Sequence, residues 1–332
     1  METRLDPDEW GLLARIADRY YRVGQTQAEI AADIGLSRQA VQRALDRARA
    51  EGVVDIHIAA PPGVHLDLET ALRERFGLVE AIVTPAAPDA SVRREAAARA
   101  AAAFLQGRLR SGIVVAVGHG RDASDVARST RSDRDLDVTF VSAMGGSPRA
   151  DAPTNPDDIA RVLAQRTGGR SLALFAPAYV ESEDLRDRLL AQDSVASTLA
   201  VAAAADIALV GVGGVDDDCT MVRTGCIPPE EIARLRSAGA VGDVLGCYVD
   251  AAGRPVASAY SRQLVGLSLP DLRRIPTVVA VASEPEKPAA IGGVLRAGAV
   301  GVLVVDEDNA RAVLGENGRV PPTPGNGRAR TP

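Results

Sequence analysis

Cysteine and histidine are scarce in this chain of 332 residues. The three cysteines are Cys219, Cys226 and Cys247. An odd number of cysteines without C-x-x-C spacing argues against a disulfide framework and against a structural zinc site. The three histidines, His57, His65 and His119, are too scattered to indicate a metal cluster. The residues therefore predict no metal and no cofactor.

Long apolar runs and aromatic side chains are also lacking. No run of about 18 uncharged apolar residues is present, so no membrane-spanning helix is predicted. Aromatic residues make up 3% of the chain and hydrophobic residues 46%, which predicts a large core of aliphatic side chains. The first residues are acidic rather than basic and apolar, so we expect no signal peptide and a cytoplasmic location.

Lysine is almost absent. Of the 38 basic residues, Lys287 is the one that is not arginine. A compact ammonium group binds differently from a planar guanidinium, so a chain that otherwise uses arginine has a reason to keep one lysine at a binding site. Lys287 is therefore a candidate contact for a phosphate, carboxylate or sugar hydroxyl. The alternative is a solvated lysine retained by chance.

The stretch from residue 26 to residue 50 is typical of a helix-turn-helix. Thr26 and Glu29 fit a capping box at the start of a first helix. Gly35 fits the left-handed residue of a tight turn, and Ser37 fits the cap of a second helix. A helix starting near Asp6, with Trp10 and Tyr21 on its apolar face, would brace this pair. We expect a short strand at Val53–Ile58 to follow.

The second helix has an apolar face opposite a face rich in arginine and glutamine. The segment Ser37–Ala50 has a net charge of +3, from 4 Arg and 1 Asp, whereas the whole chain has a net charge of −6. Arginine can bond guanine and glutamine can bond adenine, and both can hold phosphate. The predicted DNA contacts are Thr26, Gln27, Ser37, Arg38, Gln39, Gln42, Arg43 and Arg47. The alternative is an ordinary pair of helices with a solvated charged face.

From Val92 onward, short apolar runs alternate with helical segments. The predicted strands are 113–117, 138–142, 171–174, 207–212, 278–282 and 302–305, and a further strand at 78–83 precedes them. Continuous apolar strands separated by helices predict an α/β fold with a parallel sheet covered on both faces. The predicted domains are a DNA-binding unit at 1–60, a linker with a connecting helix and strand at 61–91, an effector domain at 92–314, and a disordered tail at 315–332.

Several predicted strands end in turns that contain glycine. These turns are Gly118–Arg121, Gly145–Gly146 and Gly211–Gly214. In an open α/β sheet ligands bind beyond the carboxyl ends of the strands, where backbone N–H groups are available. Glycine is also favoured in such turns for steric reasons alone. The spacing matches neither a dinucleotide-binding fingerprint nor a P-loop, and no Ser or Cys has an evident base partner.

The chain resembles the SorC family of sugar-responsive transcriptional regulators from about Leu5 to Leu314. Besides the helix-turn-helix, the resemblance is carried by LETALRERFGLVEAIV, VAVGHGRDASDVA, AMGG, NPDDIARVLA, PAYVESEDLRDRLL, ADIALVGVGG, AGAVGDVLGCYVDAAGRPV and VVAVASEPEKPAAIGGVLRAGAVGVLVVDEDNA. It implies a helix-turn-helix or winged-helix DNA domain and a Rossmann-like effector domain similar to sugar-phosphate isomerases and CoA-transferases. It also implies a homo-oligomer, either a dimer or a tetramer, that binds double-stranded operator DNA under control of a sugar or phosphosugar.

The resemblance also implies a ligand site. The implied contacts are Gly118, His119, Gly120, Arg121, Asp122, Gly145, Gly146, Gly213, Asp243 and Lys287. Two positions depart from the family pattern: Asp122 stands where a threonine is frequent, and Ser283–Glu284 stands where two glycines are frequent. Both departures add negative charge, which favours an unphosphorylated sugar or polyol as the effector.

Two other functions compete with that of a regulator. One is a sugar-phosphate isomerase or an aldolase-like enzyme in which Lys287 forms a Schiff base, although no acid–base pair for proton transfer is evident. The other is a helical module that binds protein rather than DNA, which the positive charge of the second helix disfavours.

Overall fold

The computed structural model describes residues 7–54, 61, 63–148, 154–284 and 287–315. The chain divides into two compact units, Met1–Ala60 and Pro61–Pro332, which we call the N-terminal unit and the larger unit. Each unit is described separately.

The N-terminal unit contains three helices: α1 (Pro7–Tyr21), α2 (Gln27–Ile34) and α3 (Arg38–Ala50). The side chain of Thr26 accepts a hydrogen bond from the backbone N–H of Glu29, and Glu29 completes the capping box. Gly35 ends α2 with φ at 70°, and the Ser37 hydroxyl accepts from the N–H of Ala40 at 3.1 Å to begin α3. The helix-turn-helix that the sequence predicts is therefore formed.

The core of the N-terminal unit differs in one respect from the expected pattern. Trp10 and Tyr21, predicted on the buried face of the first helix, are 45% and 39% exposed. The buried face of α1 consists of Leu13 and Ala17, which were also predicted on that face, and of Ile16, and these three follow the spacing of one helical stripe. The strand expected at Val53–Ile58 and the tail expected to be disordered fall mostly outside the described residues.

The larger unit is built on a parallel sheet of seven strands in the order β1-β9-β8-β5-β2-β3-β4. These strands are β1 (Glu80–Thr84), β2 (Val114–Val117), β3 (Thr139–Ser142), β4 (Arg170–Leu172), β5 (Ile207–Gly211), β8 (Thr277–Ala282) and β9 (Val302–Asp306). Most of their residues are buried, as expected when helices cover both faces of a sheet. Two further strands, β6 (Ala240–Val244) and β7 (Cys247–Asp250), form a separate antiparallel hairpin.

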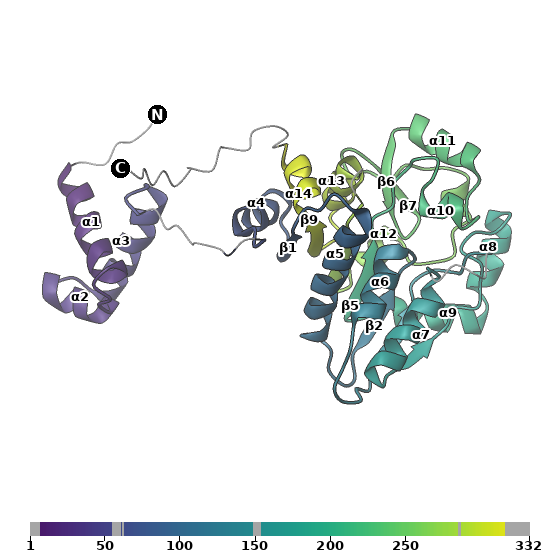
Figure 1. The fold of residues 1–332 in the computed structure, drawn as a ribbon, viewed down its shortest axis with the longest axis horizontal. Helices are drawn as coiled ribbons and strands as arrows, with labels where there is room; N and C mark the ends of the chain where they lie inside the picture. The colour runs from purple at the N-terminus through teal and green to yellow at the C-terminus, as the bar shows by residue number, and fades with distance from the viewer. Residues whose placement is uncertain (1–6, 55–60, 62, 149–153, 285–286, 316–332) are drawn as a thin grey trace, which may run out of the picture. The chain divides into compact units, whose positions relative to one another are not determined.

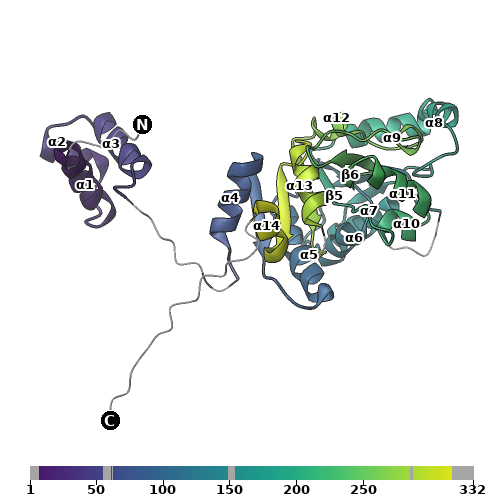
Figure 2. The ribbon, with the colours of Figure 1, turned by 90° about the horizontal axis from the view of Figure 1, so that it is seen from above.

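Helices cover the two faces of the parallel sheet and form two apolar cores (Figures 1 and 2). One face carries α5 (Ala90–Gln106), α6 (Arg121–Ser129) and α7 (Pro156–Thr167). The remaining helices are α4 (Leu66–Phe76), α8 (Glu183–Leu190), α9 (Asp193–Ala203), α10 (Thr220–Arg223), α11 (Pro229–Ser237), α12 (Leu269–Leu272), α13 (Pro288–Arg296) and α14 (Glu307–Leu314), with a 3₁₀ turn at Tyr260–Arg262. Figure 2 shows α5 and α6 on one side of the unit and α9 and α12 on the other.

The segment 61–91 is more than the connection that the sequence suggested. Its strand β1 is an edge strand of the sheet and pairs in parallel with β9, with Glu80 opposite Val302. Its helix α4 places Leu68 and Leu72 in the core of the larger unit. Both elements are part of the larger unit because their apolar side chains are buried there. Among the described helices, none combines the length and the apolar character needed to cross a membrane.

Candidate functional site

The centre of the sheet contains a point at which the chain changes direction. Strands β2 and β5 are neighbours, but the chain continues from β2 towards β3 and β4, and from β5 towards β8 and β9. The connections after these two strands therefore diverge and leave a crevice at their carboxyl ends, which is where open α/β sheets bind ligands.

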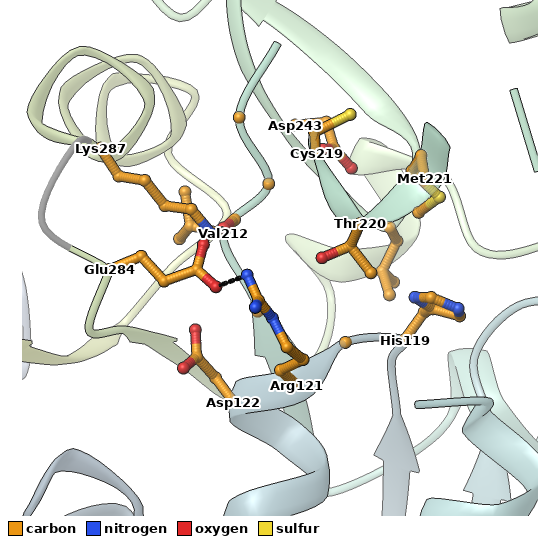
Figure 3. A pocket seen from close by; sticks show the side chains of 15 residues that line it. His119, Arg121, Asp122, Val212, Cys219, Thr220, Met221, Asp243, Glu284 and Lys287 are labelled. Carbon is orange, nitrogen blue, oxygen red and sulfur yellow. Dashed lines mark hydrogen bonds and ion pairs between the residues drawn. The ribbon is translucent and has the colours of Figure 1, made fainter. Parts of the chain in front are cut away.

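A cavity with about 490 Å³ of empty space lies at this position. It is lined by His119, Gly120, Arg121, Asp122, Gly211, Val212, Gly213, Gly214, Cys219, Thr220, Met221, Asp243, Leu245, Glu284 and Lys287. Turns after β2, β5 and β8 meet the tip of the β6–β7 hairpin here (Figure 3).

The hairpin is fixed to the end of β5 by backbone hydrogen bonds. Gly213 donates to the carbonyl of Asp243 at 2.9 Å, and Asp243 donates back to the carbonyl of Gly213 at 3.0 Å. A Cβ on Gly213 would lie 1.8 Å from Oδ1 of Asp243, so this close approach requires glycine. The N–H of Gly246 donates to Oδ2 of Asp243 at 2.8 Å, which holds the carboxylate at the cavity wall.

A single carboxylate connects the two cations of the cavity. Lys287 Nζ lies 2.6 Å from Oε2 of Glu284 and donates to the carbonyl of Val212 at 2.8 Å. The guanidinium of Arg121 forms an ion pair with Oε1 of the same glutamate. Burial alone would raise the pKa of Glu284, but the charges of Lys287 and Arg121 lower it below its ordinary value. Glu284 is therefore ionised at neutral pH.

Burial raises the pKa of three further acidic groups of the cavity. Burial raises the pKa of Asp243 to about 6, against the stabilising effects of the Gly246 N–H and Lys287. Burial also raises the pKa of Asp122, whose Oδ1 accepts a hydrogen bond from the Ser283 hydroxyl at 2.7 Å. Burial raises the pKa of the Cys219 thiol to about 11, so this thiol is not an activated nucleophile.

His119 is the clearest unsatisfied group in the cavity. Its side chain is buried, and its Nε2 has no hydrogen-bond partner within the described residues. Burial lowers the pKa of His119 to about 4, which keeps the imidazole neutral near pH 7. A neutral imidazole can donate or accept a hydrogen bond, so Nε2 is available to a ligand in the cavity.

The predicted ligand residues do not all reach this cavity. Those that line it are His119, Gly120, Arg121, Asp122, Gly213, Asp243 and Lys287. Gly118 lies behind the lining, where a Cβ would be 2.6 Å from Cδ2 of Leu245. Gly145 and Gly146 follow β3 and pack against other loops: Gly145 donates to the carbonyl of Val265 at 2.9 Å, and Gly146 donates to that of Ala176 at 2.9 Å. The ligand contacts of all ten residues stay predictions.

Several lining residues were not in the predicted set. Cys219, Thr220, Met221 and Leu245 reach the cavity because α10 and the β6–β7 hairpin fold over the end of β5. Neither element had a strong signal in the sequence. Within the part of the chain that the structure describes, no group of three or more His, Cys, Asp or Glu side chains is arranged to hold a metal ion.

The candidate DNA-binding surface lies on α2 and α3 of the N-terminal unit. Arg38, Gln39 and Arg43 are exposed, and their side chains have no partner among the described residues. Gln42 is held in place, since it accepts from Gln27 and donates to Asp46 at 3.0 Å. Arg47 forms ion pairs with Glu9 of α1 and with Glu51. Of the predicted contacts on α3, Arg38, Gln39 and Arg43 are therefore the most available.

Comparison with known proteins places this architecture in a family. Residues 61–315 match the sugar-binding domain family Sugar-bind. Over 312 residues the chain is 34% identical to the transcriptional regulator LsrR of Klebsiella pneumoniae, covering 91% of this chain and 92% of that protein. The chain belongs to the SorC family of sugar-binding transcriptional regulators.

Two further relatives of this SorC-family chain extend over nearly its full length. It is 30% identical to the erythritol catabolism regulatory protein EryD of Brucella abortus, covering 95% of this chain and 99% of that protein. The crystal structure of the full-length sorbitol operon regulator SorC from Klebsiella pneumoniae matches with a TM-score of 0.71 and 25% identity, covering 92% of this chain and 99% of SorC. The chain is thus a transcriptional regulator with an N-terminal helix-turn-helix and a Rossmann-like effector domain.

Proposed function

We propose that this SorC-family chain binds double-stranded operator DNA of carbohydrate genes, and that a sugar or sugar phosphate in the cavity controls its operator affinity. The cavity at the change of strand direction supports this proposal most strongly. It combines a preformed space with an unpartnered imidazole nitrogen, and it lies in the segment that matches the sugar-binding domain family. The relatives LsrR, EryD and SorC are named as regulators, which supports the same conclusion.

DNA binding is assigned to the exposed face of α3. This helix begins at a capped N-terminus and displays Arg38, Gln39 and Arg43 without internal partners among the described residues. Recognition helices of this type lie in the major groove and present such side chains to base edges and phosphates. We propose a homo-oligomer, a dimer or a tetramer, since a two-fold pair of such helices reads the two halves of a pseudo-palindromic operator.

The proposal assigns no catalytic step to the cavity. A Schiff-base lysine must present a free amine to a carbonyl group. The ammonium group of Lys287 instead contacts the Glu284 carboxylate and the Val212 carbonyl. These contacts favour a lysine that positions other groups rather than one that attacks a substrate.

The replacement Arg43→Ala tests the DNA-binding part of the proposal. Fluorescence anisotropy with DNA from upstream of the chain's own gene, measured over a series of salt concentrations, would give the affinity. If Arg43 contacts a base, its loss should weaken specific binding by about tenfold or more. If it contacts a phosphate, the slope of the logarithm of affinity against the logarithm of salt concentration should become shallower by about one.

Arg22→Ala is the matched control for this experiment. Arg22 lies in the same unit, carries the same charge and pairs with Asp18 at 3.4 Å. The control should bind operator DNA like the original chain. Equal affinity of Arg43→Ala and Arg22→Ala would contradict the assignment of α3, and no binding of the original chain at any salt concentration would contradict the proposed function.

A further inference from the structure

The lining of the candidate site contains more acidic than basic side chains. An outer cavity adjoins the first one and shares Arg121, Glu284 and Lys287 with it. Together the two cavities are lined by the acids Asp122, Asp216, Asp218, Asp243 and Glu284 and by the bases Arg94, Arg121 and Lys287. A phosphate ester that enters this space therefore meets a surplus of carboxyl groups.

The bases are, in addition, already paired with carboxylates of the chain. Glu284 lies between Arg121 and Lys287 and points at both, as Figure 3 shows. Arg94 lies 3.7 Å from Oδ2 of Asp125. A phosphate group is bound by basic side chains that surround it. Here the Glu284 carboxylate occupies the space between the two cations that line the inner cavity.

The start of α6 carries a carboxyl group of its own. A helix N-terminus attracts anions through its free N–H groups and its dipole. Asp122 stands in the first turn of α6, where it is buried and accepts a hydrogen bond from the Ser283 hydroxyl. Its carboxyl group adds an acid close to the helix end that an incoming anion would approach.

Besides Nε of Arg121, which is buried and also lacks a hydrogen-bond partner among the described residues, the groups that remain free to contact a ligand suit hydroxyls. Nε2 of His119 is buried and has no partner among the described residues, and the imidazole is neutral near pH 7. The Asp243 carboxyl is fixed in the wall by the Gly246 N–H and by its backbone bonds to Gly213. A sugar hydroxyl can donate to a carboxylate and accept from an imidazole N–H, whereas a phosphate dianion has no proton to donate.

We propose that the cavity selects an unphosphorylated sugar or polyol and rejects its phosphate esters, because Glu284 acts as a built-in anion between Arg121 and Lys287. The proposal rests on the proposed function for the existence of a carbohydrate effector. The discrimination against phosphate depends on Glu284, and it can be measured with inorganic phosphate even when no carbohydrate effector is known.

The test compares the full-length chain with Glu284→Gln, which keeps the shape of the side chain and removes its charge. Glu284→Ala is a second variant, so that a folding defect in one does not decide the result. Glu230→Gln is the control, since Glu230 is an exposed glutamate on α11 outside both cavities. The probes are inorganic phosphate and three matched pairs: D-ribose with ribose 5-phosphate, D-fructose with fructose 6-phosphate, and D-sorbitol with sorbitol 6-phosphate. Calorimetric titration gives the affinities, and operator binding is recorded with each probe.

The unmodified chain and Glu230→Gln should bind at least one unphosphorylated probe more tightly than its phosphate ester, and should bind inorganic phosphate weakly. The Glu284 variants should bind inorganic phosphate and phosphate esters about tenfold more tightly or better, since a like charge has been removed from the contact. Affinity for the unphosphorylated probe should change less than affinity for the ester.

Two results would overturn the proposal. One is a phosphate ester that binds the unmodified chain more tightly than its parent sugar. The other is inorganic phosphate that binds the unmodified chain as tightly as it binds the Glu284 variants. If no sugar, polyol or ester binds or changes operator affinity, the proposed sensing function is contradicted, while the inorganic phosphate titration still decides the role of Glu284.

Discussion

At the scale of single residues, His119 shows how burial fixes the chemistry of the cavity. Its imidazole is removed from water without a compensating charge, and this lowers its pKa to about 4. The charged form is therefore unfavourable in the folded chain over most of the pH range in which an exposed histidine titrates. The consequence is a neutral hydrogen-bonding group that keeps its protonation state at neutral and mildly acidic pH.

The replacement His119→Gln should change how stability depends on pH. The pKa of histidine is 6.5 in the unfolded chain and about 4 for His119 in the folded chain. The unfolded state therefore binds more protons than the folded state between these two pH values. As a result, the contribution of the neutral His119 to the free energy of unfolding is fully present above pH 6.5 and is lost as the pH falls towards 4. Relative to His119→Gln, the free energy of unfolding of the unmodified chain should rise by on the order of 3 kcal/mol from pH 4 to pH 6.5 and then level off.

Urea unfolding of both proteins at a series of pH values measures this difference. Asp243 and the other acids are common to both proteins, so their titration cancels in the comparison. A difference that is constant between pH 4 and pH 8 would show that His119 is not held neutral by burial.

The sequence predicted some of these residues and missed others for a physical reason. Lys287 stood out because lysine is otherwise absent, and it does line the cavity. Glu284 was noticed only as added negative charge, since one glutamate among 44 acidic residues has no compositional signal. Its importance depends on the ion pairs with Arg121 and Lys287, and Arg121 is distant from it in the sequence.

At the scale of elements, the end of β5 and the β6–β7 hairpin form one wall of the cavity. They are joined by the paired backbone hydrogen bonds of Gly213 and Asp243. Gly211, at the other end of the same turn, is open by comparison: a Cβ there would have its nearest neighbour, the carbonyl of His119, at 3.7 Å. Two glycines of one turn therefore differ sharply in the space around them.

The pair Gly213→Ala and Gly211→Ala tests this wall. The new methyl group at Gly213 would lie 1.8 Å from the Asp243 carboxylate, so the hairpin must move or the backbone bonds must break. We expect Gly213→Ala to lower the free energy of unfolding by about 1–3 kcal/mol and to abolish the effect of sugars on operator binding. Gly211→Ala should retain the stability of the unmodified chain, because its methyl group meets no close neighbour. Thermal unfolding and anisotropy titrations provide the measurements, and equal behaviour of the two variants would exclude a close contact between Gly213 and Asp243.

The elements themselves were predictable where their hydrophobic pattern was continuous. The runs at β2, β5, β8 and β9 are almost wholly apolar, and the sequence placed each of them to within a few residues. The β6–β7 hairpin was missed because Gly242 and Asp243 interrupt its pattern. Helix α9 was missed because its alanine-rich sequence has little contrast between its faces. The glycine turn after β3 was expected in the site, but no sequence pattern indicates towards which side of the sheet a loop will turn.

At the scale of the whole molecule, the division into two units predicts that they are separable. The match to the sugar-binding domain family covers residues 61–315, which coincides with the described part of the larger unit. This unit contains both apolar cores of the sheet, and the N-terminal unit has a core of its own. The larger unit alone should therefore keep carbohydrate binding and lose operator binding.

We expect the fragment 61–315 to unfold cooperatively and to bind the same carbohydrate as the full chain, within about threefold in affinity. It should not bind operator DNA. Calorimetry measures the unfolding and the carbohydrate affinity of the fragment, and fluorescence anisotropy measures its DNA binding, each with the full chain as the control. A fragment that is unfolded, or one that binds operator DNA like the full chain, would contradict the division.

Helix α14 contacts both the loop at Glu284 and helix α4. Asn309 of α14 donates to the main-chain carbonyl of Glu284 at 2.8 Å. Helix α4, which follows the junction of the two units, is tied to the same helix because Arg75 donates to the carbonyl of Leu314 at 2.7 Å and His65 lies 3.5 Å from Glu307. The loop at Glu284 and helix α4 are thus both bonded to the one short helix α14. A ligand that displaces this loop would therefore act on a hydrogen bond to the helix that also holds α4.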